Sequence, residues 1–166
     1  MSINTSRENR IGLNILLIED DSEDVVLVQE MLASSKELDF NLSYALRVQK
    51  GYEYLTTRKF DLIILDLNLP DCYGVDTIHR IKQIIPTIPI LIITGSTLRT
   101  DEINECIILS DGYLVKGYFN SNNLIHKILE SIENKNEHNF FNSFLDNNKI
   151  CKTNKKIMDL KNQLNL

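Results

Sequence analysis

Short apolar runs alternate along the chain with segments whose apolar residues recur at helical spacing. Most of the runs lack a polar face, as is typical of parallel strands covered by helices on both sides. The pattern predicts strands over 13–19, 40–46, 60–66, 88–95 and 112–116. It predicts helices over 21–35, 48–59, 75–85, 99–110 and 123–133, with Ser22 as a cap of the first. Alternating strands and helices in this order predict an α/β fold with a doubly wound parallel sheet.

Polar side chains follow four of these strands at the point where each strand ends. Glu19 and Asp20 end the first strand, Asp66 the third, Thr94 the fourth and Lys116 the fifth. In an open parallel sheet, ligands bind beyond the carboxyl ends of the strands. We therefore expect these side chains to share one rim, with Asp66 projecting into a solvent-accessible pocket.

The chemistry of this rim is that of a cation and a phosphoryl group. Clustered carboxylates repel each other, and Mg²⁺ relieves the repulsion because it prefers oxygen ligands. A carboxylate can also attack phosphorus and form an aspartyl-phosphate. Each of these residues alone has a simpler interpretation, since an acid at a strand end often only caps a helix or forms a turn. The joint arrangement at four strand ends favours a functional site.

The net charge, the cysteines and the lengths of the apolar stretches further limit the class of protein and its surroundings. The 166 residues carry a formal net charge of −5, which does not favour nucleic acid as a partner. Three distant cysteines, Cys72, Cys106 and Cys151, argue against a disulfide framework and for a reducing compartment. The chain contains no apolar stretch of membrane-spanning length, so we expect a cytoplasmic protein without a membrane partner.

Four motifs resemble the receiver domain of two-component response regulators, the CheY-like family. They are "ILLIEDD", "DLIILDLNLPDCYGVD", "PILIITGS" and "DGYLVKGYF", in the order that the family has them. The resemblance covers residues 12–133 and implies a flavodoxin-like sheet with strand order 2-1-3-4-5. It implies a response regulator that functions in phosphorelay signal transduction.

The resemblance assigns roles to the rim. Asp66 would accept a phosphoryl group from a histidine kinase or a histidine phosphotransfer protein. Asp20 would bind Mg²⁺ directly, Glu19 more weakly or through water, and the backbone carbonyl of Asn68 would complete the protein ligands. Asp21 is interpreted as helix decoration at a favourable N-terminal position.

The resemblance also implies a switch. Thr94 and Lys116 would hold the phosphoryl oxygens, and Tyr113 would change rotamer with Thr94, although a half-buried edge aromatic is an equally good interpretation. The surface of the fourth helix, fifth strand and fifth helix would then bind a downstream protein effector or a second copy of the chain. Gly117 departs from the family, which usually has a proline there, and we expect a trans peptide bond.

Several alternatives remain open on sequence alone. A phosphorelay intermediate would pass the phosphoryl group onward. A phosphatase with an aspartyl nucleophile would need a second acid where Asn68 stands, and a degenerate receiver would lack one of the acids. We expect a signalling phosphoacceptor, with only self-phosphorylation and autodephosphorylation chemistry, rather than a metabolic enzyme.

Residues 134–166 are predicted to be an extension rather than a DNA-binding domain. The segment has six lysines against three acidic residues, nine asparagines, and no glycine or proline. Two apolar clusters with helical spacing, 140–145 and 157–164, stand out in it. A tail folded back on the domain, a helix used for dimerisation or docking, and disorder are the three interpretations.

Overall fold

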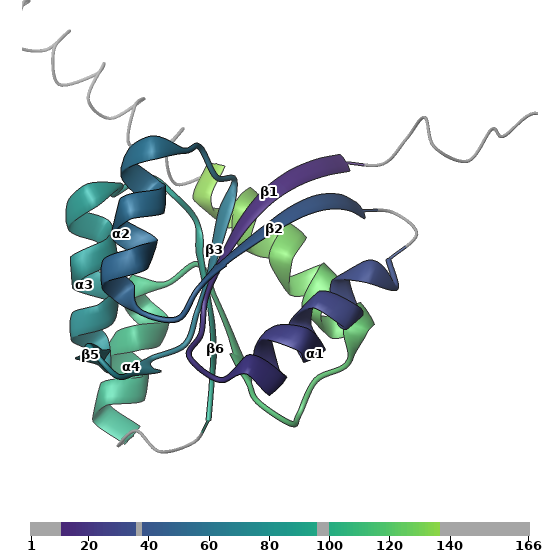
Figure 1. The fold of residues 1–166 in the computed structure, drawn as a ribbon. Coiled ribbons are helices and arrows are strands. Elements are labelled where there is room, and N and C mark those ends of the chain that lie inside the picture. The colour runs from purple at the N-terminus through teal and green to yellow at the C-terminus, as the bar shows by residue number, and fades with distance from the viewer. Residues whose placement is uncertain (1–10, 36–37, 96–99, 137–166) are drawn as a thin grey trace, which may run out of the picture.

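A five-stranded parallel sheet forms the centre of the molecule (Figure 1). The computed structural model describes residues 11–35, 38–95 and 100–136. The strand order is β2-β1-β3-β6-β7, which corresponds to the predicted order 2-1-3-4-5. These strands are β1 (Ile11–Ile18), β2 (Leu38–Ala45), β3 (Leu62–Leu65), β6 (Ile90–Thr94) and β7 (Gly112–Val115).

Five helices connect and cover the strands within the described residues. They are α1 (Ser22–Ala33), α2 (Val48–Thr57), α3 (Val75–Ile84), α4 (Thr100–Leu109) and a last helix over 121–136. A short antiparallel hairpin, β4 (Asn68–Leu69) with β5 (Cys72–Tyr73), follows β3. The apolar pattern did not predict this hairpin, because two residues are too few to show a period.

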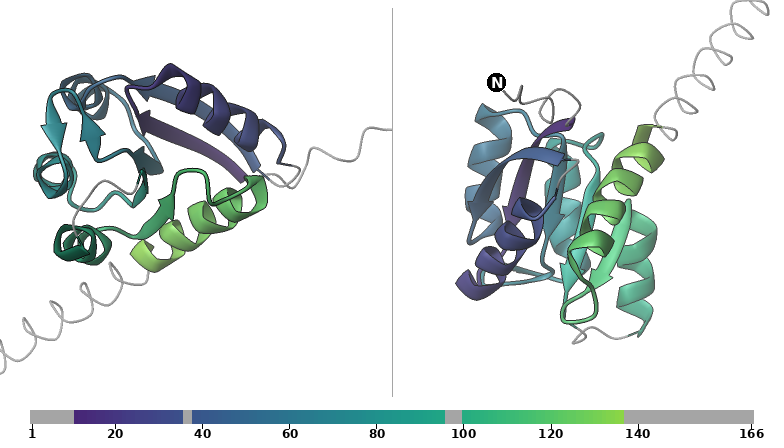
Figure 2. Two further views of the ribbon diagram at one scale, coloured as in Figure 1. Left: turned by 90° about the horizontal axis from the view of Figure 1, so that it is seen from below. Right: turned by 90° about the vertical axis from the view of Figure 1, so that its right-hand side faces the viewer.

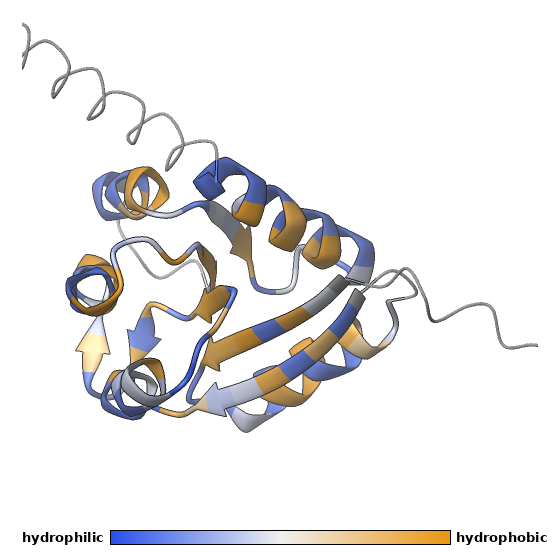
Figure 3. Ribbon diagram, turned by 90° about the horizontal axis from the view of Figure 1, so that it is seen from above, coloured by the Kyte–Doolittle hydropathy of each residue, from blue (hydrophilic) through white to orange (hydrophobic). Residues whose placement is uncertain are grey.

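Two apolar cores lie on opposite faces of the sheet. On one face, Leu16 and Ile63 pack with residues of α2, α3 and α4, including Leu55, Ile78 and Cys106. On the other face, strand residues that alternate with these pack against α1 and the last helix. Figure 2 shows α2, α3 and α4 on one side of the sheet, and α1 and the last helix on the other. Figure 3 shows the apolar residues concentrated between these layers. The flavodoxin-like fold predicted from the sequence is therefore confirmed.

The predicted elements are present with small shifts at their ends. The first helix is capped by Asp21, whose side chain accepts a hydrogen bond from the Glu23 amide, so the expected Ser22 cap is wrong. Asp21 directly precedes Ser22 and has the extended backbone that a capping residue needs, so Ser22 is already the first residue of the helix. The last helix extends to residue 136 rather than 133.

The N-terminus of α2 is capped by a residue from another part of the chain. Arg47, at the cap position, makes no side-chain hydrogen bond to the helix. The carboxylate of Asp71, in the β4–β5 turn, accepts hydrogen bonds from the amides of Val48 and Gln49, both at 3.0 Å. This contact ties the loop that follows Asp66 to the start of α2.

Gly51 lies inside α2, where a glycine ordinarily weakens a helix. Here it allows close packing, because a Cβ at this position would lie 2.6 Å from Cδ1 of the fully buried Ile18. The glycine lets α2 approach β1.

The predictions about the cysteines and about the C-terminal extension fall only partly within the described residues. Cys72 and Cys106 are free thiols, whereas Cys151 lies outside the described residues. The extension after residue 136 also lies outside them. Within the described part of the chain, none of the helices combines the length and apolar character needed to cross a membrane.

Candidate functional site

The carboxyl ends of the strands bring the candidate residues together. The amide of Glu19 donates to the Ala45 carbonyl of β2 at 3.0 Å, and the amide of Asp66 donates to the Ile18 carbonyl of β1 at 2.9 Å. These bonds extend the sheet ladder one residue beyond each strand. The backbone of each carboxylate is therefore as firmly placed as the sheet itself.

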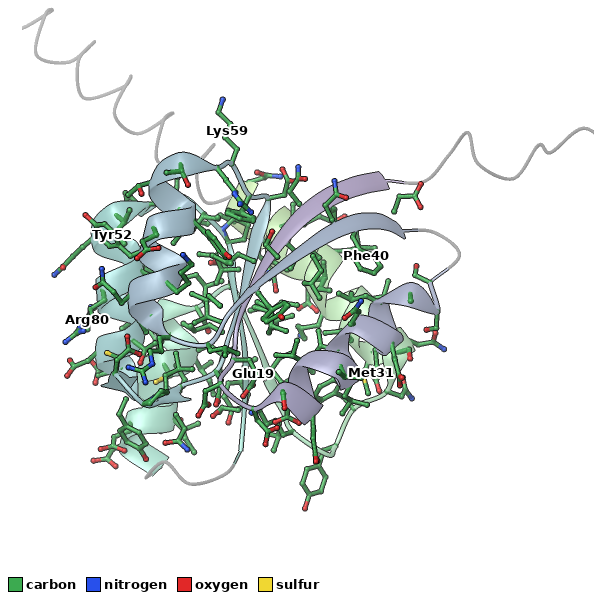
Figure 4. All side chains as sticks on the ribbon, in the orientation of Figure 1. Glu19, Met31, Phe40, Tyr52, Lys59 and Arg80 are labelled. Atoms are coloured by element: carbon green, nitrogen blue, oxygen red, sulfur yellow. The ribbon has the colours of Figure 1, made fainter. Side chains whose placement is uncertain are left out.

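Three carboxylates converge at this rim. Single oxygens of Glu19, Asp20 and Asp66 all lie within 4.8 Å of one another. Figure 4 shows Glu19 at the end of the sheet remote from Lys59. Glu19 and Asp66 are each only 3% exposed, whereas Asp20 is exposed. A compact set of oxygen donors, open on one side, fits a hard divalent cation such as Mg²⁺.

Burial of this cluster changes the pKa of Glu19. Burial, with a further contribution from the charge of Asp66, raises the pKa of Glu19 to about 7. Lys116 opposes this shift through a hydrogen bond and its charge, but only partly. The amide of Asp21 donates to Oε1 of Glu19 at 3.2 Å and further fixes that side chain.

Lys116 is the cationic counterpart of the cluster. Its Nζ lies 2.7 Å from Oε2 of Glu19, 2.8 Å from Oδ2 of Asp24 and 3.4 Å from Oδ2 of Asp66. Burial would lower the pKa of the Lys116 ammonium, but hydrogen bonds with Asp24 and Glu19 outweigh it and raise the pKa. The lysine is therefore held as a cation among three acids.

Asp24 is a site residue that the sequence analysis missed. It lies in the first turn of α1, where an acid normally complements the helix dipole and carries no special signal. Its spacing places it one helical turn beyond the acidic pair at the end of β1. Only the packing of α1 against the sheet, which sets its first turn near the loop after β7, brings it to Lys116.

Asp66 is oriented by its own loop. Its Oδ1 accepts a hydrogen bond from the Leu67 amide at 2.8 Å, while its Oδ2 faces Lys116. These neighbours contact both oxygens and leave Asp66 only 3% exposed, so the carboxylate is nearly enclosed rather than in the solvent-accessible pocket that was expected. Asn68, whose backbone carbonyl was predicted as a metal ligand, is exposed and begins β4.

The two predicted switch residues stand on neighbouring strands. Thr94 ends β6 and is 1% exposed, and its carbonyl accepts a hydrogen bond from the Lys116 amide at 3.0 Å. Tyr113 of β7 lies opposite Ile92 and is half-buried against the core that contains Cys106. Burial raises the pKa of the Tyr113 phenol. The position of Tyr113 on an edge strand agrees with both interpretations offered for it.

The turn after Lys116 requires glycine. Gly117 has a φ of +80°, a region that proline cannot adopt and other residues adopt only with strain. The described residues contain no cis peptide bond, as expected for this position. The departure from proline is therefore part of a differently shaped turn.

The class of protein follows from this fold and from a comparison with known families. Residues 15–129 match the family of response regulator receiver domains. Because the match spans most of the chain, the protein belongs to that family and is a receiver domain of two-component signalling. The predicted family is thereby confirmed.

Named relatives agree with this assignment. The transcriptional regulatory protein BasR of Escherichia coli (strain K12) is 30% identical over 106 residues, which are 64% of this chain and 46% of BasR. The cell cycle transcriptional regulator CtrA of Caulobacter vibrioides (strain NA1000 / CB15N) is 31% identical over 106 residues, 64% of this chain and 45% of CtrA. The chain thus spans about half the length of these curated relatives.

Solved structures show the same fold. A CheY-like receiver domain protein from Methanospirillum hungatei JF-1 has a TM-score of 0.64 at 19% identity, covering 77% of this chain and 99% of that one. The phosphorylated cyanobacterial phytochrome response regulator RcpA has a TM-score of 0.57 at 27% identity, covering 71% and 89%. The first likeness concerns the fold alone.

Proposed function

We propose that this receiver domain accepts a phosphoryl group on Asp66 from a histidine kinase or a histidine phosphotransfer protein, in a Mg²⁺-dependent reaction. The observation that carries the proposal is the convergence of Glu19, Asp20 and Asp66 within 4.8 Å beside Lys116. A structural role alone would not require three acids and a lysine at one rim, two of the acids nearly buried.

The orientation of Asp66 supports a nucleophilic role. Its Oδ1 is occupied by the Leu67 amide, which leaves Oδ2, on the side of Lys116, to attack phosphorus. A new O–P bond forms as the N–P bond of the donor phosphohistidine breaks. The electron pair of that bond stays on the imidazole nitrogen, which takes a proton from water. Lys116, released from one of its carboxylates, pairs with a phosphoryl oxygen.

The carboxylates of Glu19, Asp20 and Asp66 would hold the cation, with the backbone carbonyl of Asn68 as a further ligand. When bound, Mg²⁺ supplies positive charge that offsets the charge of the transferring phosphoryl group. The chain's own contribution is to keep the acceptor in place and to limit the access of water, since Asp66 and Thr94 are almost fully buried.

The output would pass through the surface formed by α4, β7 and the last helix. Thr94 would donate its hydroxyl to the new phosphoryl oxygens, and Tyr113 would follow because β6 and β7 are neighbours. Ile107, Ile108 and Tyr118 are already exposed there, Ile108 to 81% and Tyr118 to 87%. Phosphorylation would bias this surface towards a protein effector or a second copy of the chain by its different interaction with two states.

The proposed role is that of a signalling module rather than a metabolic enzyme. An aspartyl phosphatase would use a second acid two residues after the nucleophile, and that position is Asn68. RcpA, a relative of the same fold, is described in its phosphorylated form. This supports phosphorylation of the receiver domain here.

The test is phosphorylation by a small donor. The full chain is incubated with acetyl phosphate and Mg²⁺, and its intact mass is measured with and without a chelator. The wild-type protein is expected to gain one phosphoryl group only with Mg²⁺, whereas Asp66→Asn gains none. Asp76→Asn, which removes an exposed acid from the first turn of α3, is the matched control and keeps the gain. A mass gain in Asp66→Asn equal to that of the wild type would refute the proposal.

A further inference from the structure

The outer edge of β2 is a second feature of the molecule, separate from the carboxylate rim. β2 stands at the end of the described sheet and pairs only with β1. The Ala45 carbonyl accepts from Glu19 on the β1 side. Because successive backbone groups of a strand point to alternate sides, those of Leu42 and Tyr44 face away from β1. They form an edge at which another strand can add.

A groove runs between this edge and α2, and its lining is cationic. Its polar lining includes Arg47, Lys50 and Arg58, together with Tyr44 and Tyr54. The full set of lining residues, 42–47, 50, 54 and 58, contains no acid, although the chain as a whole carries a net charge of −5. Figure 1 shows α2 beside β2 along this side of the molecule. The groove therefore presents a local positive field in an acidic protein.

The helix side of the groove has a regular spacing. Lys50, Tyr54 and Arg58 follow one another at intervals of four residues, so they form one stripe along α2 and the residue after it. Lys50 and Arg58 both lie over the ring of Tyr54, at 5.2 Å and 4.6 Å from its centroid. The Tyr54 ring thus makes a cation–π contact with each of the two cations.

This spacing matches that of an extended peptide. Four residues of helix rise about 6 Å, and every second residue of a strand recurs at about 6.6 Å. A strand that lies along β2 would therefore present the side chains of one face to the stripe in turn. Acidic side chains at alternate positions would meet Lys50 and Arg58, and backbone groups would pair with Leu42 and Tyr44.

We infer that this groove, here called the β2-edge groove, binds an extended acidic segment of a partner protein by strand addition, with acidic side chains at alternate positions. Among the described residues, Lys50 of the stripe forms an ion pair with Glu53 at 2.6 Å. Both side chains are about half exposed, so this pair yields to a partner's carboxylate at little cost. The inference does not depend on the phosphoacceptor chemistry.

A second copy of the chain is a poorer occupant of the same edge. Pairing of β2 with its own copy would bring the cations Arg47, Lys50 and Arg58 of both chains together. Like charges brought together beside a strand edge discourage such pairing. The same charges attract a strand of opposite sign, so they select an acidic partner and disfavour self-association.

The test uses the full chain and a fluorescent peptide of four glutamate–valine repeats. Fluorescence anisotropy should show saturable binding, and Arg58→Glu should weaken it about tenfold because an attraction becomes a repulsion. Lys59→Glu, the matched control, makes the same charge change one residue away, outside the groove lining, and should alter the affinity less than twofold. Circular dichroism of each variant verifies that it is folded.

A second peptide tests strand addition itself. N-methylation of alternate peptide residues removes the amides on one edge without changing charge, and should abolish binding when that edge faces β2. Equal binding of both N-methylated isomers, equal loss in Lys59→Glu, or no saturable binding would overturn the inference. So would displacement of the peptide by an equally tight oligodeoxythymidylate, or a dimer in light scattering that Arg58→Glu dissolves.

Discussion

Lys116 lies closer to Asp24, at 2.8 Å, than to Asp66, at 3.4 Å. The lysine that the family resemblance assigns to the phosphoryl group is thus held in this structure by an acid on α1. Any group that binds beside Asp66 and needs the ammonium must compete with Asp24 for it. The Lys116–Asp24 ion pair therefore restrains the lysine that the proposed phosphorylation needs.

Asp24→Asn is therefore expected to speed phosphorylation by acetyl phosphate about two- to fivefold. An ion pair of this exposure contributes about 0.5–1 kcal/mol. In the variant, Lys116 no longer has to break this pair before it contacts the phosphoryl group, so the barrier falls by that amount. The rate of phosphoryl mass gain measures the effect. Glu23→Gln, which removes an exposed charge from the same helical turn, is the control. A rate equal to that of the wild type would show that Asp24 does not restrain the lysine.

Lys116→Met is expected to reduce the free energy of unfolding by about 3 kcal/mol in the presence of a chelator. It leaves the nearly buried acids Glu19 and Asp66 without their cation, and removal of one partner from a buried pair has a cost of this size. Urea denaturation measures the change. Lys127→Met removes the cation of the more exposed pair with Glu130 and should cost less than about 1 kcal/mol. Equal losses in the two variants would contradict the argument.

Asp71→Asn is expected to destabilise the protein by about 1 kcal/mol at pH 7. The two carboxylate oxygens accept from Val48 and Gln49, and an amide offers only one acceptor. Although burial opposes it, these amide hydrogen bonds lower the pKa of Asp71. Its stabilising contribution is therefore present above the unfolded pKa of about 3.9 and is lost as the pH falls through the lower, folded value.

The difference between wild type and Asp71→Asn should consequently vanish at low pH, where the protonated acid resembles the amide. Urea denaturation at pH 7 and at successively lower pH measures both proteins. Asp76→Asn, on the exposed start of α3, serves as the reference for a charge change without a cap on another helix. A difference that stays constant with pH would mean that the cap does not depend on the charged form.

Gly51→Ala is expected to destabilise the protein by about 1 kcal/mol, although alanine is the better helix former. The new Cβ would lie 2.6 Å from Cδ1 of Ile18, which is fully buried, so the core would have to shift to make room for it. In an Ile18→Val background, which lacks the Cδ1 atom, the same change should be neutral or stabilising. Urea denaturation of the four proteins of this cycle gives the coupling energy. Additive effects would show that Ile18 and Gly51 do not constrain each other.

The sequence by itself determined the fold class and most of the rim. Strands covered on both faces need continuous apolar residues, so the apolar runs around Ile15, Ile63 and Ile92 could be recognised as strands. Because parallel strands end at the same edge of a sheet, the polar residues that follow these runs must lie together. Local pattern could not predict the β4–β5 hairpin or the cap of α1 by Asp21, because one or two residues carry no period.

Only the tertiary structure decided which distant side chains meet. The ion pair of Lys116 with Asp24, the cap that Asp71 supplies to α2 and the fit of Gly51 against Ile18 join residues from different elements. The same is true of the burial of Asp66. These contacts depend on how helices pack against the sheet, and packing is a property of three-dimensional neighbours that spacing along the chain does not record.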